Sequence, residues 1–171
     1  MKKNLLKEWG PTIVLTLLLS LVCRTYVAEA VVVPSGSMLP TIQLQDRLLV
    51  EKFTGPASLK YGDVVVFYPP IPGQESQRFI KRLIGIGGDT IEIKNHTLYR
   101  NGVKVEEPYV KQKMNYDYGP VKIPQGNFFF LGDNRNNSYD SHLWPTPFVD
   151  QNKIVGKAVV TFFPFSDFKQ F

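Results

Sequence analysis

The sequence predicts a mainly β protein in which one N-terminal apolar helix precedes a single strand-rich domain. Three observations predict this class. Residues 9–28 are almost entirely apolar, the rest of the chain contains short runs of β-branched and aromatic residues, and Gly and Pro, with 13 of each in 171 residues, separate those runs. The length suits one modest domain, and the sequence has no internal repeat.

The first element is a predicted transmembrane helix over residues 9–28. No charged residue lies between Trp9 and Cys23, and a helix of this length would span about 30 Å, the thickness of the hydrocarbon layer. Arg24 is close enough to one end to reach the headgroups. Because Lys2, Lys3 and Lys7 precede the span, residues 1–8 are expected in the cytoplasm and residues 29–171 outside the membrane.

A cleavable secretory signal is an alternative interpretation of the same segment. A basic start and a short apolar stretch lead to Ala28-Glu29-Ala30, which fits the small-x-small pattern of a cleavage site. Both interpretations export the remainder of the chain, and these residues alone leave the choice open.

Strands are predicted wherever β-branched and aromatic residues cluster between turn signals. The tight dipeptides Asn95-His96 and Asn101-Gly102 divide residues 91–105 into a three-stranded meander. The polar stretch Gly132–Asp140 is predicted to be a loop, and no long amphipathic helix follows Pro34. The other predicted strands are Leu48–Phe53, Val64–Tyr68, Arg78–Ile84, Asn127–Leu131 and Ile154–Phe163.

Composition narrows the partners and cofactors. The net charge of +5 is mild and the basic residues are scattered, so a membrane surface is a better partner than nucleic acid, which we do not expect to bind. The single Cys23 allows neither an intrachain disulfide nor a cysteine-based metal site. We expect no metal and no cofactor.

The segment Pro34–Thr41, PSGSMLPT, presents Ser37 in a predicted extended loop stiffened by two prolines. Serine in such a loop is usually structural, and a nucleophilic serine needs a base. The two histidines are His96, in the meander turn, and His142, so a triad of Ser37, His142 and Asp140 is conceivable on composition alone.

Lys81 offers a base other than histidine. In a strand, the period of two places Phe79, Lys81 and Leu83 on one face and Arg82 on the other. Such a lysine usually pairs with a carboxylate. If it is buried among apolar groups, its pKa must fall from ~10.4 by more than three units for the amine to be mostly neutral at pH 7. A neutral Lys81 could then accept the proton of Ser37.

The polar loop Gly132–Ser141, GDNRNNSYDS, has two interpretations. In the structural one, Arg135 pairs with Asp133 or Asp140. In the functional one, Ser138 and Asp140 orient a catalytic base.

The order of these motifs is more specific than any one of them. PSGSMLPT after an apolar span, then GDVVVF, FIKRLIGIGGDT and GDNRNNSYDS ahead of IVGKA, resembles the type I signal peptidase family of membrane-bound Ser/Lys proteases. The resemblance implies a β protease fold with Ser37 as nucleophile and Lys81 as general base. It further implies that Ser35 helps to hold the oxyanion, that Ser138 orients Lys81 and that Asp140 supports the loop. Residues 89–126 correspond to a small insertion.

The resemblance also implies a substrate and a location. Signal peptides of exported preproteins would bind as extended strands and be cut after Ala-x-Ala motifs, by a monomer held in the plasma membrane through a retained single-pass anchor. Self-cleavage after Ala30 would remove that anchor. The pocket positions are Val31, Val33, Pro34, Met38, Ile42, Leu48, Val66, Phe79 and Ile80.

Two residues depart from the family pattern. Asn136 replaces a common Asp and His142 a common Arg, which predicts a more loosely tied loop and an activity more sensitive to acid. The alternative functions are an inactive exported β domain that acts as a binding module and a soluble Ser/Lys autoprotease of the repressor-cleaving type. The apolar span argues against the autoprotease.

Overall fold

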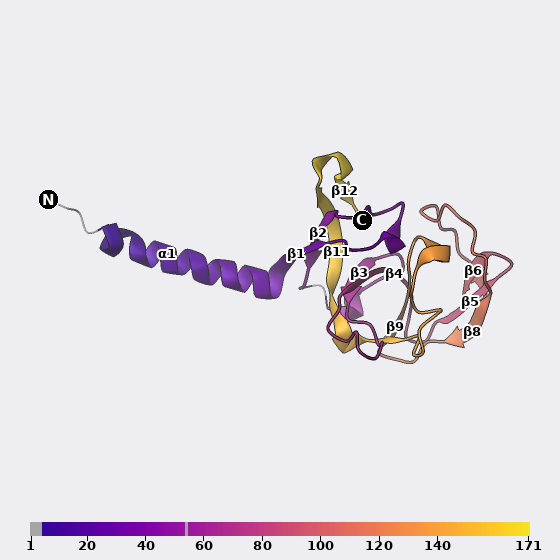
Figure 1. The fold of residues 1–171 in the computed structure, drawn as a ribbon. Helices are drawn as coiled ribbons and strands as arrows, with labels where there is room; N and C mark the ends of the chain where they lie inside the picture. Colours follow the sequence, from indigo (N-terminus) through magenta and orange to yellow (C-terminus); the bar gives the residue numbers. More distant parts are fainter. Residues whose placement is uncertain (1–4, 54) are drawn as a thin grey trace.

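The computed structural model describes residues 5–53 and 55–171 and consists of a projecting helix and a β domain (Figure 1). Helix α1 (Leu5–Val22) continues as a π-helical segment, Cys23–Val27. Residues Trp9–Val27 are long and apolar enough to cross a membrane, and none of this span is buried against the β domain. Ala28, expected to end the span, is instead the first residue of strand β1.

Two antiparallel sheets form the β domain. The larger has eight strands in the order β1-β2-β11-β3-β4-β9-β10, with β12 paired to β11, and the smaller has the order β7-β6-β5-β8. The strands are β1 (Ala28–Val32), β2 (Arg47–Glu51), β3 (Val64–Phe67), β4 (Phe79–Ile86), β5 (Thr90–Lys94), β6 (Thr97–Arg100), β7 (Val103–Lys104), β8 (Tyr118–Lys122), β9 (Asn127–Leu131), β10 (Val149–Asp150), β11 (Ile154–Phe163) and β12 (Lys169–Gln170).

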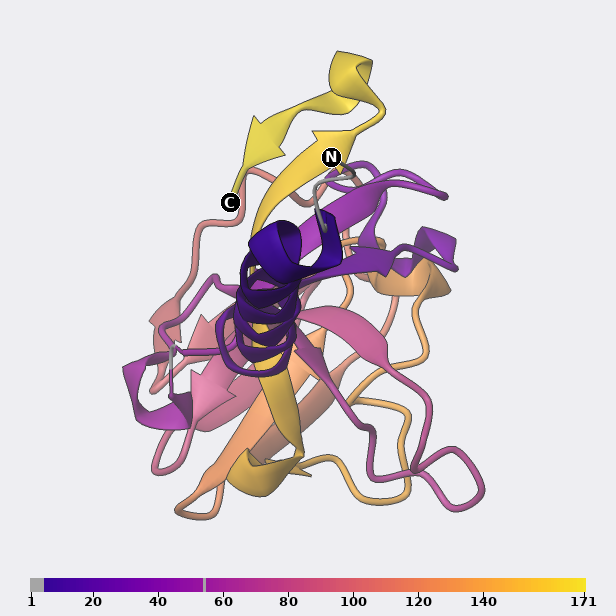
Figure 2. The same cartoon turned by 90° about the vertical axis from the view of Figure 1, so that its left-hand side faces the viewer.

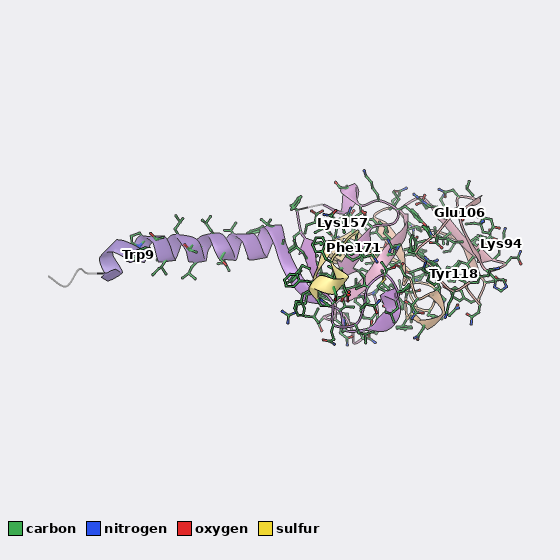
Figure 3. The ribbon with its side chains drawn as sticks, turned by 90° about the horizontal axis from the view of Figure 1, so that it is seen from above. Trp9, Lys94, Glu106, Tyr118, Lys157 and Phe171 are labelled. Atoms are coloured by element: carbon green, nitrogen blue, oxygen red, sulfur yellow. The ribbon has the colours of Figure 1, made fainter. Side chains whose placement is uncertain are left out.

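The smaller sheet lies at the end of the β domain farthest from α1. Figure 3 shows Lys94 and Glu106 at that end, whereas Trp9 marks the opposite extreme of the molecule on α1. Figure 2, seen from the α1 side, shows β11 crossing the domain and ending in its hairpin with β12. The helix and the smaller sheet therefore flank the larger sheet.

The structure confirms the predicted fold class and meander. Both turn dipeptides adopt positive φ at both residues, 49° and 65° at Asn95 and His96 and 54° and 78° at Asn101 and Gly102, as two-residue hairpin turns require. Strands β1, β8, β10 and β12 were not predicted. β8 contains Gly119 and Pro120, two residue types depleted in strands, and β1 follows the apolar span without a turn signal.

Three hydrophobic clusters make up the core. One contains Leu59, Phe67 and Trp144 together with residues of β3, β4 and β9, and another joins β4 and β9 to the smaller sheet through Ile84, Ile91 and Phe129. The third underlies the predicted site and contains Val31, Val33, Met38, Ile42, Leu48, Val50, Val64, Val66, Ile80 and Ala158.

Candidate active site

Ser37 lies in a single 3₁₀ turn, Gly36–Met38, between β1 and β2. The expected extended loop is therefore replaced by a compact turn with its backbone at negative φ. Met38 is fully buried beneath the turn, and Ser37 is 8% exposed. The apolar side chain of Met38 thus fixes the turn to the core while the Ser37 hydroxyl faces the neighbouring strand β4.

Lys81 points from β4 toward Ser37. Its Nζ donates a hydrogen bond of 2.6 Å to Ser37 Oγ and lies 5.2 Å from the centre of the Phe79 ring. Only 4% of Lys81 is exposed, and this burial lowers the pKa of its amine to about 8, although the negative charge of Asp140 partly opposes the shift. The site thus holds an amine that titrates near neutral pH within reach of a hydroxyl.

Two further serines lie beside this pair. Ser35 Oγ is 3.4 Å from Ser37 Oγ, on the same turn. Ser138 Oγ is buried and has no hydrogen-bond partner among the described residues, so the expected contact with the Lys81 ammonium is not formed in this structure. A Cβ at Gly132 would collide with Ser138 Oγ and with the Ser37 carbonyl, which explains why glycine precedes this loop.

The loop from Gly132 to Asp140 is bonded directly to the Ser37 turn. The Asn134 backbone N–H donates to the Ser37 carbonyl at 3.0 Å, and Asn134 Nδ2 donates to the Gly36 carbonyl at 3.1 Å. Asp140 is fully buried and accepts from the Gly132 N–H at 2.9 Å. Its other oxygen lies 2.6 Å from His142 Nδ1. The loop therefore ties the serine turn to Asp140, the carboxylate whose charge acts on Lys81.

The expected partner of Arg135 was wrong. Neither Asp133 nor Asp140 binds it; Glu107, from the segment after β7, accepts two hydrogen bonds of 2.6 and 2.8 Å from its guanidinium. Asp133 instead binds Arg82 of β4 through two hydrogen bonds of 2.7 and 2.6 Å. Glu107 and Asp133 thus each have a guanidinium partner that is distant in sequence.

The expectation of a loosely tied loop at Asn136 is also corrected. Asn136 Oδ1 accepts from the Asn115 N–H at 3.0 Å, and its Nδ2 donates to the Lys113 carbonyl at 2.9 Å. An ionised aspartate has no donor for the second bond. Asparagine therefore connects this loop to residues 113–115 through both ends of its amide.

The structure does not form the conceivable histidine triad. Among the described residues, the side-chain hydrogen bonds of Ser37 Oγ are those with Lys81 and Ser35. The His142 ring stacks on Tyr116 at 4.0 Å between ring centres. His96 binds the Met114 carbonyl. Lys81 is thus the only described base in hydrogen-bond contact with the Ser37 hydroxyl.

A cavity of about 420 Å³ opens beside Ser37 and Lys81. Five of the nine predicted pocket residues line it: Val33, Pro34, Met38, Phe79 and Ile80. The other four, Val31, Ile42, Leu48 and Val66, are buried in the cluster beneath it. Sequence reasoning missed Gly36, Gln77, Arg78, Asn137 and Tyr139, which also line the cavity. The floor is apolar, whereas Gln77, Arg78 and Asn137 contribute polar groups to its walls.

The described residues include no group of three His, Cys, Asp or Glu side chains that could hold a metal ion. The serine hydroxyls of Ser35, Ser37 and Ser138 and the amine of Lys81 are the groups described above at this site. A hydroxyl bonded to a buried amine is the arrangement that a serine nucleophile needs when its base is lysine.

Comparison with known proteins gives a consistent result. The family model described as "Signal peptidase, peptidase S26" matches residues 6–163. Signal peptidase I of Leptolyngbya laminosa is 44% identical over 168 residues, which cover 93% of this chain and 80% of that protein. Signal peptidase I T of Bacillus subtilis is 39% identical over 181 residues, covering 99% and 91%.

A solved structure shares the fold. The crystal structure of a signal peptidase I from Enterococcus faecalis superposes with a TM-score of 0.50 at 32% identity, covering 58% of this chain and 95% of that one. The curled β-sheet, the buried serine and the relatives together define a serine peptidase. The chain belongs to the signal peptidase family, peptidase S26.

Proposed function

We propose that this protein is a membrane-anchored endopeptidase that removes signal peptides from exported preproteins, with Ser37 as nucleophile and neutral Lys81 as general base. The observation that carries the proposal is the 2.6 Å contact between Lys81 Nζ and Ser37 Oγ in a buried pocket. Lys81 makes no ion pair with the described carboxylates. Its ammonium therefore lacks the contact that would hold it protonated.

The proposed reaction begins when neutral Lys81 accepts the Ser37 hydroxyl proton. Ser37 Oγ then attacks the carbonyl carbon of the scissile peptide bond, and the carbonyl oxygen becomes an oxyanion. The Ser37 N–H and the Ser35 hydroxyl, 3.4 Å from Ser37 Oγ, are the proposed donors to that oxyanion. The Lys81 ammonium next gives its proton to the leaving amine, which leaves an ester on Ser37. A water deprotonated by Lys81 hydrolyses the ester and restores the hydroxyl.

Ser138 and Asp140 support Lys81 in this proposal. Ser138 Oγ is buried without a described partner, and we assign it to accept a hydrogen bond from the ammonium that forms during the reaction. Asp140 holds the start of the loop through the Gly132 N–H and stabilises the protonated amine through its charge. Both groups act by positioning Lys81.

The apolar cavity supports a preference for small side chains. Val33, Met38 and Ile80 are buried and line its floor, and Val31 and Val66 pack below them. A close-packed floor of this kind admits alanine and excludes larger groups by steric overlap. Cleavage after Ala-x-Ala would place the cut residue and the residue two before it over this floor.

Lipid is the second proposed partner. Helix α1 supplies an anchor with its N-terminus in the cytoplasm, as the three lysines before the apolar span Trp9–Val27 favour. The hairpin of β11 and β12 exposes Phe165 (82%) and Phe168 (61%), apolar groups suited to the membrane surface. Holding enzyme and substrate in one bilayer raises their effective concentration. We propose a plasma-membrane location and a monomer.

Retention of the anchor can be tested by intact-mass measurement of the membrane fraction. Ala28, Glu29 and Ala30 lie in β1, paired with Glu51, Val50 and Leu49 of β2. A protease must bind such a segment outside its sheet, so we expect the full-length mass. Loss of residues 1–30 would contradict the anchor.

The decisive experiment is cleavage of a preprotein with an Ala-x-Ala junction by the full-length protein in detergent. Wild type should cut at that junction, and Ser37→Ala and Lys81→Ala should lose activity by at least about 10³-fold. Ser58→Ala and Lys94→Ala, at exposed sites outside the cavity, are matched controls that should keep full activity. Failure of the wild type to cut would favour the binding-module alternative, and full activity in either site variant would overturn the dyad.

A further inference from the structure

An ion cluster borders the cavity through Arg78. Arg78, which lines the cavity immediately before β4, donates from Nη1 to Glu29 Oε1 of β1 at 2.7 Å. Lys52, just after β2, lies with Nζ 2.9 Å from the other oxygen of Glu29. Glu29 is mostly buried, whereas Arg78 is partly exposed. The carboxylate therefore has both oxygens occupied, and the exposed member of the cluster is the guanidinium.

The cavity lies between an edge of β1 and an edge of β4. Along these two edges the backbone has no strand partner among the described residues. β1 ends the order of the larger sheet and pairs with β2 on one side. Phe79, Ile80 and Lys81 pair with β3, but the pairing of β4 with β9 begins only at Arg82. The backbone of residues 79–81 on the β9 side, like the outer edge of β1, thus has no strand partner among the described residues. An extended substrate can add to either edge.

The direction of the substrate follows from the position of α1, and this step rests on the function proposed above. β1 follows directly on the end of the N-terminal helical segment (Figure 1) and leads along the chain into the turn that contains Ser37. The segment of a preprotein upstream of its cut lies in the membrane, as α1 does in this proposal. The substrate must therefore run parallel to β1, with its upstream residues toward Glu29 and Arg78.

The alternation of side chains sets which substrate residue meets the cluster. Glu29, Val31 and Val33 share one face of β1, and Arg78 and Ile80 share one face of the chain entering β4. Val31, Val33 and Ile80 belong to the apolar cluster below the cavity, so this face changes from apolar to charged as it leaves Ser37. Same-face residues are spaced about 6.6 Å apart in a strand. If the first and third residues before the scissile bond occupy the apolar floor, the fifth lies over Arg78.

We infer that Arg78, held by Glu29, is a specificity-determining residue that reads the side chain of the fifth substrate residue before the scissile bond and favours a carboxylate over an ammonium group. The member of the cluster that faces the cavity is a cation, and it is more exposed than the carboxylate that holds it. Glu29 has no free oxygen for a substrate cation, whereas the Arg78 guanidinium has five N–H donors, more than Glu29 and Tyr68 occupy. A substrate lysine at this position meets repulsion without a compensating acceptor.

The test measures kcat/KM for preproteins that differ only at that fifth residue, which is Glu, Gln or Lys. We expect wild type to prefer Glu over Lys by about 5-fold, the scale of a partly exposed ion pair. Arg78→Gln should reduce this ratio to within about 2-fold, and Arg78→Glu should reverse it. Arg47→Gln, at an exposed arginine on β2, is the matched control and should keep the wild-type ratio.

A second substrate series separates local recognition from a general charge effect. The same three residues at the fourth position before the bond, whose side chain points to the opposite face, should give ratios that Arg78→Gln does not change. Cleavage of the Gln substrate with no charge preference at the fifth position would overturn this inference and leave the proposed function intact. No cleavage of the Gln substrate at all would instead overturn the proposed function.

Discussion

Lys81 and Arg82 are neighbours on β4 but lie in opposite electrostatic environments. Lys81 Nζ contacts a neutral hydroxyl, and burial lowers the pKa of its amine to about 8. Burial also disfavours the charge of Arg82, but the Asp133 carboxylate outweighs it and raises the pKa of the guanidinium above its ordinary value. The Gly62 carbonyl accepts another bond at 2.6 Å, and Tyr109 stacks 3.9 Å away. One strand thus keeps one cation ready to lose its proton and the other permanently charged.

The largest effects are expected when lysine and arginine are exchanged at positions 81 and 82. In Lys81→Arg the proposed base becomes a guanidinium that stays protonated, so cleavage should fall by at least about 10³-fold. The mirror substitution Arg82→Lys removes the two-pronged bond to Asp133 and should lower stability while leaving measurable cleavage. Equal losses of activity in both variants would contradict the division of roles.

Removal of the Asp133 carboxylate tests whether that carboxylate stabilises the buried guanidinium of Arg82. Asp133→Asn leaves the buried guanidinium without its anion, which should lower the free energy of unfolding by about 3 kcal/mol. Urea denaturation of wild type and variant measures the change. Lys104→Ala, which breaks an exposed pair with Glu106, is the control and should change stability by less than about 0.5 kcal/mol. A stable Asp133→Asn protein would show that Arg82 does not depend on its partner.

The dependence of activity on pH reports the protonation state of the Lys81 amine. Because the neutral amine is the proposed active form and its pKa is about 8, activity should rise with pH and level off above pH 8. The neutral fraction is about 1% at pH 6 and about half at pH 8, so kcat/KM should increase about 50-fold between them. The measurement needs a substrate without groups that titrate in this range. A flat profile would contradict a neutral lysine base.

The smallest expected effect comes from His142→Arg. Asp140 raises the pKa of Lys81, and an arginine beside Asp140 would stay charged at every working pH, whereas a histidine is charged only when protonated. A permanent cation should weaken the influence of Asp140 on Lys81, so kcat/KM at neutral pH should stay equal or rise by up to about 3-fold. A large drop would show that stacking on Tyr116 matters more than charge.

The parts of the molecule that follow from local pattern were predictable. The meander depends on two turn dipeptides, and Ser37 and Lys81 lie in short motifs whose order is specific. The partners of Arg82 and Arg135 were not predictable, because Asp133 is 51 residues away and Glu107 is 28 residues away. Asn136 was misinterpreted for a related reason: its two backbone partners lie more than 20 residues earlier, where the sequence has no pairing signal.

The residues that line the cavity were also only partly predictable from the sequence. Apolar residues on β1, β2 and β3 were expected to line a pocket, but none of these three strands places its expected residue on the cavity wall. Val31, Leu48 and Val66 lie beneath the floor instead. Arg78 was missed because a charged residue before a strand usually marks a solvent-exposed end. Only the fold brings it opposite Glu29, 49 residues away.

The direct junction between the helical segment and the β domain limits the distance between Ser37 and the membrane. The helical segment ends at Val27 and β1 begins at Ala28, so no spacer separates the two. Nine residues lie between Val27 and Ser37, and an extended chain of that length reaches at most about 30 Å. With α1 in a bilayer, the reacting hydroxyl stays at a bounded height above the lipid. A substrate whose scissile bond lay much farther from its own hydrophobic segment would have to fold back to be cut.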